Sequence, residues 1–148
     1  MSKPRGIRNC NPGNIRKTDT KWKGEVPGGD GAFETFSSMA YGYRALIKLL
    51  QNYQKNQRLK TIRQLFNRWA PSSENNTEAY IATVARETGF GRDQAIDMKD
   101  RRTAILMAAA ISFVENGIKA NMNDVMRGWE LLETISRQWK RYSRYYSC

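Results

Sequence analysis

The segment from Asp100 to Gly117 limits what this chain can fold into more than any other part of the sequence. It holds the longest apolar run, 104–114, which only Ser112 interrupts. Apolar residues at helical spacing, an aspartate at the N-cap position and a glycine at the C-cap position together predict a helix over 101–116. The run is about half the length of a membrane-spanning helix. We therefore expect this helix to pack inside a globular domain.

Four more stretches of apolar residues at helical spacing predict helices, each with a start or stop signal. Serine, threonine and asparagine are preferred N-caps, glycine is a preferred C-cap, and proline disfavours helix in the residue before it. The expected spans are about 37–56 (Ser37 or Ser38 as N-cap), 61–70 (Thr61 as N-cap, Pro71 as stop), 76–89 (Asn76 or Thr77 at the start, Gly89 at the end) and from about 123 onward (Val125, Trp129, Leu132, Ile135 and Trp139 as the apolar face).

The stretch 5–36 differs, because it is rich in Gly, Pro and Asn and has only short extended pieces. Gly28, Gly29 and Gly31 can supply the turn of a small β-hairpin. The sequence therefore predicts a mostly α fold of the α+β class, with five helices and one small hairpin near the N-terminus. A length of 148 residues, 40% of them hydrophobic, suits a single domain spanning 1–148.

The chain has 25 Lys+Arg against 14 Asp+Glu, a net charge of +11, and no histidine. The missing imidazole excludes Ser-His-Asp and Cys-His catalysis and the histidine-based zinc sites. Two cysteines, Cys10 and Cys148, are too few for a four-cysteine zinc site, and we expect both to be free thiols. We expect no metal and no cofactor. Carboxylate chemistry remains, and glycosidic cleavage is its best-known form.

Glu115 is the leading candidate for such chemistry. It ends the apolar stretch and continues the line of Ala104, Ala108 and Ile111 at helical spacing. Partial burial and the negative end of the helix dipole both disfavour a charged carboxylate. Both effects therefore favour a carboxylic acid that can protonate a glycosidic oxygen. The alternative is a solvated glutamate at a frayed helix end.

A glycosidase with two catalytic carboxylates needs a second one across the cleft. The expected hairpin offers Glu25, Asp30 and Glu34, and we rank Asp30 and Glu34 first. Each of the three, taken alone, is more often a solvated loop acid. A lytic transglycosylase needs no second carboxylate, because the 6-hydroxyl of the muramic sugar attacks within the substrate and one Glu acts as acid and base.

The segment 5–16 and Trp22 are the candidate substrate-binding residues. Asn9, Asn11 and Asn14 can brace a tight loop, which is the structural interpretation. In the functional interpretation their amides, with the ring of Trp22, form a wall for sugar hydroxyls and ring faces.

The C-terminal segment RQWKRYSRYYSC, residues 137–148, carries four basic residues, one Trp, three Tyr and no acid. Such a segment is either a solvated helix end or a contact with an anionic outer-membrane or wall surface. The net positive charge suits nucleic acid, anionic lipid or an acidic wall polymer.

Five stretches carry a resemblance to a known family. They are RGIRNCNPGNIR (5–16), WKG (22–24), FETFSSMAYGYRAL (33–46), FNRWAPSSENNTEAYIATVARETG (66–89) and ISFVENG (111–117). With them the chain resembles the single-domain bacteriophage lysins and virion muralytic proteins of the lysozyme-like superfamily, which include enzymes similar to lytic transglycosylases and glucosaminidases. In such enzymes the Glu-ending helix precedes the Asn-rich loop and hairpin, so the order here resembles a circular permutation.

The resemblance implies a lysozyme-like helical domain with Glu115 as the catalytic acid. Relatives usually have Asn where this chain has Cys10, and often His where it has Val114. A Glu, Asp and Thr triad at phage-lysozyme spacing has no clear match here. Hydrolysis and transglycosylation therefore both stay open.

We expect a phage or prophage enzyme, an endolysin, that cleaves the β-1,4 bond between N-acetylmuramic acid and N-acetylglucosamine and promotes host cell lysis. Without a signal peptide, it is expected to be made in the host cytoplasm and to reach the wall through a holin, a virion or a secretion machine. We expect a monomer whose partner is peptidoglycan. The alternatives are a non-catalytic virion or wall-binding protein with the same fold and a basic nucleic-acid-binding domain, for which no recognition motif is present.

Overall fold

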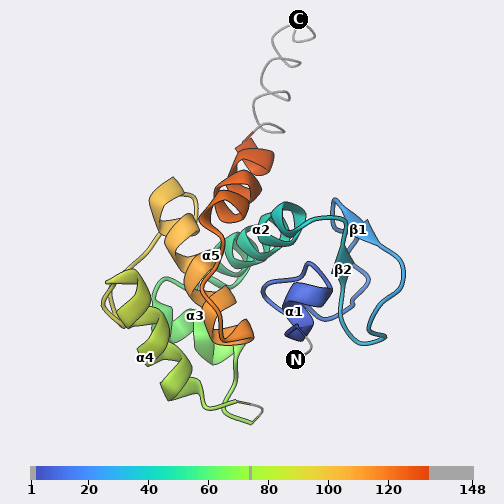
Figure 1. Ribbon diagram of the computed structural model, residues 1–148. Helices are drawn as coiled ribbons and strands as arrows, with labels where there is room; N and C mark the ends of the chain where they lie inside the picture. The colour runs from blue at the N-terminus through green and yellow to red at the C-terminus, as the bar shows by residue number, and fades with distance from the viewer. Residues whose placement is uncertain (1–2, 74, 134–148) are drawn as a thin grey trace, which may run out of the picture.

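The computed structural model describes residues 3–73 and 75–133 (Figure 1). These residues form a small two-stranded sheet and a set of helices that carry most of the chain, which confirms the mostly α fold with one hairpin. The elements in chain order are α1 Arg5–Arg8, β1 Glu25–Val26, β2 Thr35–Phe36, α2 Met39–Gln57, α3 Ile62–Trp69, α4 Thr77–Thr88 and α5 Arg101–Asn116. A further helix begins at residue 122 and is described through 133.

The end signals of the predicted helices are confirmed by hydrogen bonds. Ser38, Thr61, Asn76 and Asp100 each accept a backbone N–H of the first turn of α2, α3, α4 and α5. Thr61 and Gln64 form a reciprocal capping box. Gly89 and Gly117 end α4 and α5 in the left-handed conformation, with φ of 79° and 72°.

The N-terminal segment differs from the prediction in one element. Residues 5–8 form the short helix α1, where a loop was expected. Asn9 closes it, because its backbone N–H donates to the carbonyl of Arg5. The predicted hairpin is confirmed and short: Glu25 pairs with Phe36 and Val26 with Thr35 in an antiparallel register.

The core forms where α5 packs against α2 and α4, and where α3 packs against α4 and α2. Ala104, Ala108 and Ile111, the predicted line on α5, have no exposed surface. Val125 and Trp129 of the last helix pack against the same core. A smaller cluster of Ile15, Phe36 and Ala45 joins the N-terminal segment and the hairpin to α2. Through these two clusters, the N-terminal segment and the last described helix both pack against α2.

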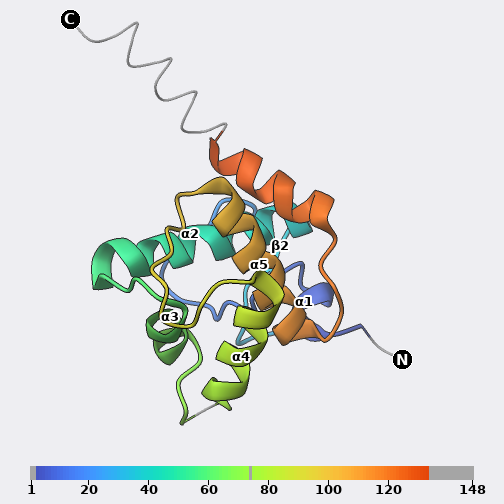
Figure 2. The ribbon, with the colours of Figure 1, turned by 90° about the vertical axis from the view of Figure 1, so that its left-hand side faces the viewer.

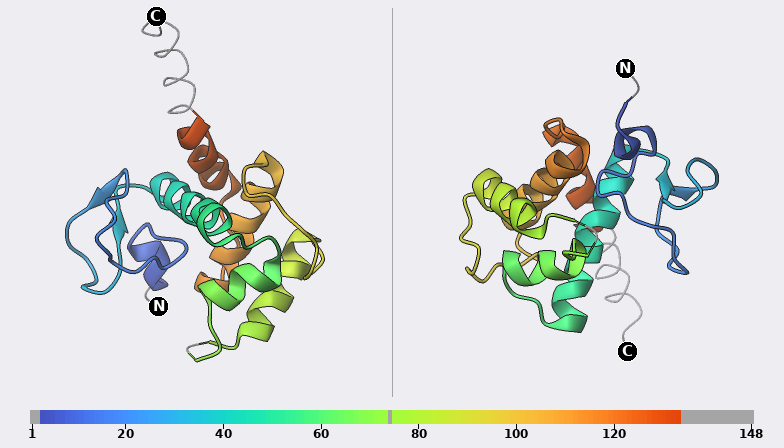
Figure 3. Two further views of the ribbon diagram at one scale, coloured as in Figure 1. Left: turned by 180° about the vertical axis from the view of Figure 1, so that it is seen from behind. Right: turned by 90° about the horizontal axis from the view of Figure 1, so that it is seen from below.

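Helix α2 separates two parts of the molecule. The N-terminal segment and the hairpin lie on one side of it, and α3, α4 and α5 lie on the other (Figure 3). Figure 2 shows α4 and α5 side by side, with α1 next to the end of α5. The N-terminal segment thus reaches the end of α5 that carries Glu115.

Several predictions fall on residues outside the described ranges: the roles of Ile135 and Trp139, the basic segment 137–148, and the state of Cys148. Cys10 is half-buried and is not part of a disulfide with any described residue. Within 3–73 and 75–133, no helix combines the length and the apolar character that a membrane crossing requires.

Candidate active site

The Asn-rich loop that follows α1 is held by the side chain of Asn11. This side chain has no exposed surface. Its Nδ2 donates to the carbonyl oxygens of Ile15 and Glu34, each at 2.9 Å, and its Oδ1 accepts the N–H of Ile15 at 2.9 Å. Three hydrogen bonds from one buried amide fix the loop against the chain that enters β2.

The same loop is attached to the C-terminal turn of α5. Asn116 Nδ2 donates to the carbonyl oxygens of Pro12 and Ser112, each at 3.0 Å. Gly6 of α1 lies so close to the Asn116 side chain that a Cβ at this position would collide with it. A glycine at position 6 is therefore required for the loop to approach the residue next to Glu115.

Glu115 is half-buried, and both of its carboxylate oxygens are hydrogen-bonded. Oε1 accepts from Asn14 Nδ2 at 2.8 Å, and Oε2 accepts from the Tyr80 hydroxyl at 2.8 Å. The partners come from the N-terminal loop and from α4. The alternative of a solvated glutamate at a frayed helix end does not fit, because Gly117 caps the helix and both carboxylate oxygens accept hydrogen bonds.

Tyr80 connects Glu115 to a second aromatic side chain. The Tyr80 hydroxyl accepts a hydrogen bond from Trp69 Nε1 at 3.1 Å while it donates to Glu115. Burial, followed by the charge and hydrogen bond of Glu115, raises the pKa of Tyr80 well above its usual range. The phenol therefore keeps its proton at physiological pH and remains a hydrogen-bond donor to Glu115.

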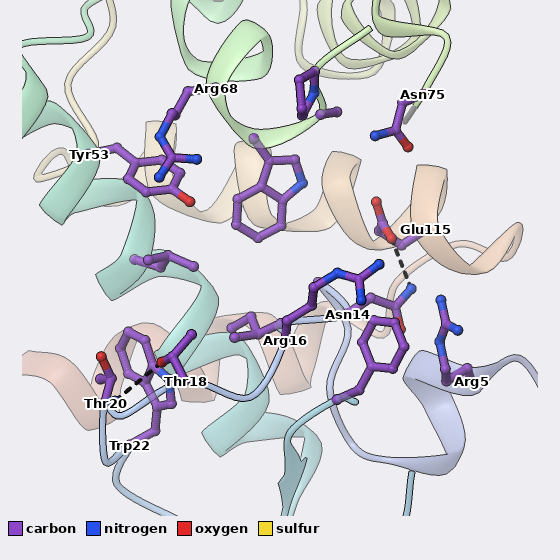
Figure 4. A pocket seen from close by; sticks show the side chains of 17 residues that line it. Arg5, Asn14, Arg16, Thr18, Thr20, Trp22, Tyr53, Arg68, Asn75 and Glu115 are labelled. Atoms are coloured by element: carbon purple, nitrogen blue, oxygen red, sulfur yellow. Dashed lines mark hydrogen bonds between the residues drawn. The ribbon is translucent and has the colours of Figure 1, made fainter. Parts of the chain in front are cut away.

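Glu115 lies in the wall of a cleft of about 950 Å³ between the N-terminal segment and the α2–α3 side of the helical part (Figure 4). Aromatic rings, polar side chains and arginines line it, and Glu115 is the only carboxylate among its described lining residues. The lining consists of Arg5, Gly13, Asn14, Ile15, Arg16, Thr18, Thr20, Trp22, Phe33, Leu49, Tyr53, Arg68, Trp69, Ala70, Pro71, Asn75 and Glu115.

Three arginines of the cleft rest on aromatic rings. The guanidinium carbons of Arg5 and Arg16 lie 3.7 Å and 4.9 Å from the centre of the Phe33 ring. Arg68 lies 5.2 Å from the centre of the Tyr53 ring. Because such contacts orient a guanidinium without neutralising it, the cleft around Glu115 is positively charged.

The predicted site residues separate into two groups. Asn14 and Trp22 line the same cleft as Glu115. Asn9 and Asn11 are buried and do not line it. The Asn9 carbonyl accepts the N–H of Phe36 at 2.9 Å, so the structural interpretation describes these two residues better than the sugar-facing one.

Neither predicted second carboxylate lies in the cleft of Glu115. Asp30 sits in the hairpin turn, where its carboxylate is 3.5 Å from the N–H of Ala32. Glu34 is 4% exposed and lines a separate cavity of about 490 Å³ together with Glu25. The fold places Glu34 there because the residue pairs its backbone N–H with the carbonyl of Ile15.

Burial is the largest cause that raises the pKa of Glu34, and the neighbouring Glu25 raises it further. Lys17 and Lys21 act in the opposite direction. The cavity thus holds two acids and two lysines, and it adjoins the main cleft through Thr18 and Trp22, which line both.

Sequence reasoning missed Tyr80 and Trp69 as partners of Glu115, and the arginines at the cleft wall. Tyr80 lies on the buried face of α4, where its ring packs against Phe66 with ring centres 4.8 Å apart. The available signal was a tyrosine hydroxyl on a face expected to be buried, since such hydroxyls usually have a partner. In the described part of the chain, no group of three or more His, Cys, Asp or Glu residues could hold a metal ion.

Comparison with known proteins gives a phage relative. The chain is 33% identical over 130 residues to Protein P5 of Pseudoalteromonas phage PM2, which covers 85% of this chain and 80% of that protein. The chain belongs to the family of Protein P5. No family model matches it.

This finding corrects the resemblance stated from the sequence motifs. Those motifs indicated the bacteriophage lysins and virion muralytic proteins of the lysozyme-like superfamily. The relative that covers most of the chain is a phage protein, but it is not named as a lysin, and no model of a lysin family matches. The assignment to that superfamily is therefore wrong, and the relative supports membership of the Protein P5 family instead.

Proposed function

We propose that this protein cleaves the glycan strands of peptidoglycan, with Glu115 as its one acid–base residue. The observation that carries the proposal is the position of this carboxylate. Glu115 lies in the wall of an open cleft, is held at both oxygens by donors from two other elements, and has no second carboxylate beside it among the described lining residues.

The walls of the cleft support a sugar polymer as substrate. Trp22, Tyr53 and Trp69 offer ring faces, and Asn14, Asn75 and the threonines offer hydrogen-bonding groups. The arginines add attraction for an anionic polymer such as the bacterial wall. A relative encoded by a phage fits this role, because a phage has to open the wall of its host.

One carboxylate among the described lining residues suits cleavage by an internal nucleophile. Glu115 gives its proton to the oxygen of the leaving N-acetylglucosamine while the bond to C1 of the muramic sugar breaks. The 6-hydroxyl of that sugar then attacks C1 and returns its proton to Glu115. Asn14 and Tyr80 stabilise the carboxylate between the two transfers, since both donate to it.

The test is digestion of purified peptidoglycan by the wild type and by Glu115→Gln, with the products identified by mass spectrometry. The proposal expects anhydro-muropeptides from the wild type and a loss of about a hundredfold or more in the variant. Glu130→Gln is the matched control, because Glu130 is exposed and, among the residues that the structure describes, pairs with Arg127 at 3.4 Å. Its rate should equal that of the wild type.

Three results contradict the proposal. Reducing muramic ends would mean that water attacks and that a hydrolase mechanism operates. Free stem peptides would mean that the enzyme cuts amide bonds. A Glu115→Gln variant that keeps more than about a third of the activity, with its fold intact by circular dichroism, would remove Glu115 from the chemistry.

A non-catalytic wall-binding protein is the second candidate. The observation that favours it is that both oxygens of Glu115 are already hydrogen-bonded, as in a structural carboxylate. Under this function the wild type binds purified wall in a pelleting assay and releases no soluble fragments at any enzyme concentration.

A further inference from the structure

The cavity beside the hairpin contains a buried carboxylate oxygen that lacks a donor. Glu34 is 4% exposed, and its buried Oε2 has no N–H or hydroxyl donor. The side chain of Glu25 lies within hydrogen-bonding reach of Glu34, so the two acids require either a shared proton or a cation between them. Glu34 lines the cavity of about 490 Å³ whose other walls come from Lys17, Lys21 and Trp22. Leaving a buried carboxylate oxygen unpaired is costly, so a ligand that donates a hydrogen bond at this point is favoured.

The other groups of the cavity define the chemistry of such a ligand. Glu25, the first residue of β1, places a second carboxylate in the same wall, where its Oε2 accepts the N–H of Trp22 at 3.3 Å. Two acids next to each other favour an ammonium group. Lys17 and Lys21 are exposed at the same cavity and offer two cations to a carboxylate. The set of charges therefore matches a zwitterion and matches neither a neutral sugar nor an anion alone.

The cavity lies next to the main cleft and shares part of its wall. Thr18 and Trp22 line both. In Figure 4, Trp22, Thr18 and Thr20 lie at the end of the cleft away from Glu115 and Asn75. A polymer that lies along the cleft and carries side groups can therefore place one of them in the cavity while its backbone passes Glu115.

We propose that the cavity formed by Lys17, Lys21, Trp22, Glu25 and Glu34 binds the zwitterionic end of a peptidoglycan stem peptide. The ammonium group of a diamino acid donates to Glu34 and Glu25 in place of the proton that the two acids share, which is released to solvent, and the adjacent carboxylate faces the two lysines. This inference rests on the proposed function for the choice of polymer. It adds that the protein selects glycan strands that still carry their peptides.

The first experiment measures binding without catalysis. The full chain is titrated with the tripeptide L-Ala–D-Glu–meso-diaminopimelic acid, followed by the NMR signal of the Trp22 indole, and in parallel with the same tripeptide acetylated on its free side-chain amine. The inference expects the acetylated peptide and the Glu34→Gln variant each to weaken binding by about tenfold or more. Asp30→Asn is the matched control, because Asp30 is a carboxylate of the same hairpin that lines neither cavity, and it should bind as the wild type does.

A second variant keeps the test valid if Glu34→Gln does not fold. Lys21→Ala changes an exposed side chain and should weaken binding of the free tripeptide more than binding of its carboxyl-amidated form. Equal binding of the free and acetylated tripeptides, no binding by the wild type, or the same loss in Asp30→Asn as in Glu34→Gln would overturn the inference.

Cleavage assays separate this inference from the proposed function. With intact peptidoglycan and with glycan strands stripped of their peptides by an amidase, the inference expects Glu34→Gln to be slower than wild type on the intact polymer only. An equal loss on both polymers would mean that the cavity holds a sugar and would overturn it. If the wild type cleaves neither polymer but binds the tripeptide as described, the result contradicts the proposed glycan cleavage and supports the proposed binding site for the zwitterion.

Discussion

Asn14 combines two properties that its position requires. Its backbone has a positive φ of 49°, in the left-handed region that asparagine and glycine tolerate best. Its side chain donates to Glu115 Oε1 at 2.8 Å. The amide therefore reaches the carboxylate because the loop turns at this residue.

Three substitutions of Asn14 separate these properties. Asn14→Gly keeps the backbone conformation and removes the donor, Asn14→Asp replaces the donor with a second acid, and Asn14→Ala also strains the backbone. All three should lower the rate of glycan cleavage by about tenfold or more, since a charge-assisted hydrogen bond is lost. Asn14→Ala should in addition unfold more easily than Asn14→Gly in urea, by about 1 kcal/mol. An Asn14→Gly enzyme with wild-type activity would show that the contact has no role in catalysis.

Glu34 should make the stability of the protein depend on pH. Burial raises its pKa above the ordinary value of 4.5, so the folded protein holds this proton more tightly than the unfolded chain does. The resulting stabilisation is complete below that ordinary value and is lost as the pH rises through the folded value. Glu34→Gln removes this dependence.

The measurement compares the melting temperatures of wild type and Glu34→Gln between about pH 4 and pH 8, where the variant should gain relative to the wild type as the pH rises. Asp100, whose pKa is lowered by hydrogen bonds from Thr103, titrates alike in both proteins and drops out of the difference. A difference that stays constant over this range would contradict the raised pKa.

At the scale of elements, α4 and α5 end in the same way but differ in what their last turns carry. Gly89 and Gly117 have φ of 79° and 72°, and neither has an atom within 4 Å of where a Cβ would lie. Their N–H groups donate to Ala85 and Phe113 at 2.9 Å and 2.8 Å. Only the last turn of α5 carries Glu115.

Gly117→Ala and Gly89→Ala are therefore a matched pair. Each should reduce the free energy of unfolding by about 1–2 kcal/mol, because alanine is strained at positive φ and nothing else obstructs it. Gly117→Ala should also slow glycan cleavage by at least about threefold, because a small displacement of a catalytic group is costly, whereas Gly89→Ala should not. Equal rates in the two variants would mean that the cap of α5 does not position Glu115.

At the scale of the whole molecule, the net charge of +11 governs the encounter with an anionic surface. Within the described ranges, three arginines line the cleft that contains Glu115. The segment 137–148, outside those ranges, adds four basic residues and no acid. The cleft arginines and the segment 137–148 should both attract an anionic surface at long range. This attraction should weaken as salt is added.

Changing Arg137, Lys140, Arg141 and Arg144 to neutral residues tests the second contribution while keeping Trp139. At low salt, the variant should act on intact Gram-negative cells more weakly than the wild type, and purified glycan should be cleaved at nearly the same rate. The difference should disappear as salt shortens the screening length from about 30 Å at 0.01 M to about 8 Å at 0.15 M. A variant as active on cells as the wild type at low salt would show that the segment is no surface anchor.

The helices and the hairpin could be predicted from the sequence because their signals are local. The N-caps Ser38, Thr61, Asn76 and Asp100 act on the next turn, and a glycine ends a helix by its own conformation. The helix α1 was missed because four residues carry no periodic signal. Glu115 could be selected as the candidate catalytic residue because its position at the end of an apolar helix is also a local feature of the sequence.

The contacts of Glu115 were decided by the tertiary structure alone. Asn14 is 101 residues away in sequence and Tyr80 is 35, so no local pattern relates them. The place of the hairpin acids was also decided by the tertiary structure. Their residue types suggested a second catalytic carboxylate, but the Glu34 backbone N–H donates to the carbonyl of Ile15 and the residue lines a neighbouring cavity. The sequence determined which segments become helices and where they end, since backbone hydrogen bonds and caps join near neighbours. The packing of α1, α4 and α5 determined which side chains meet, since that depends on burying all apolar faces of the chain at once.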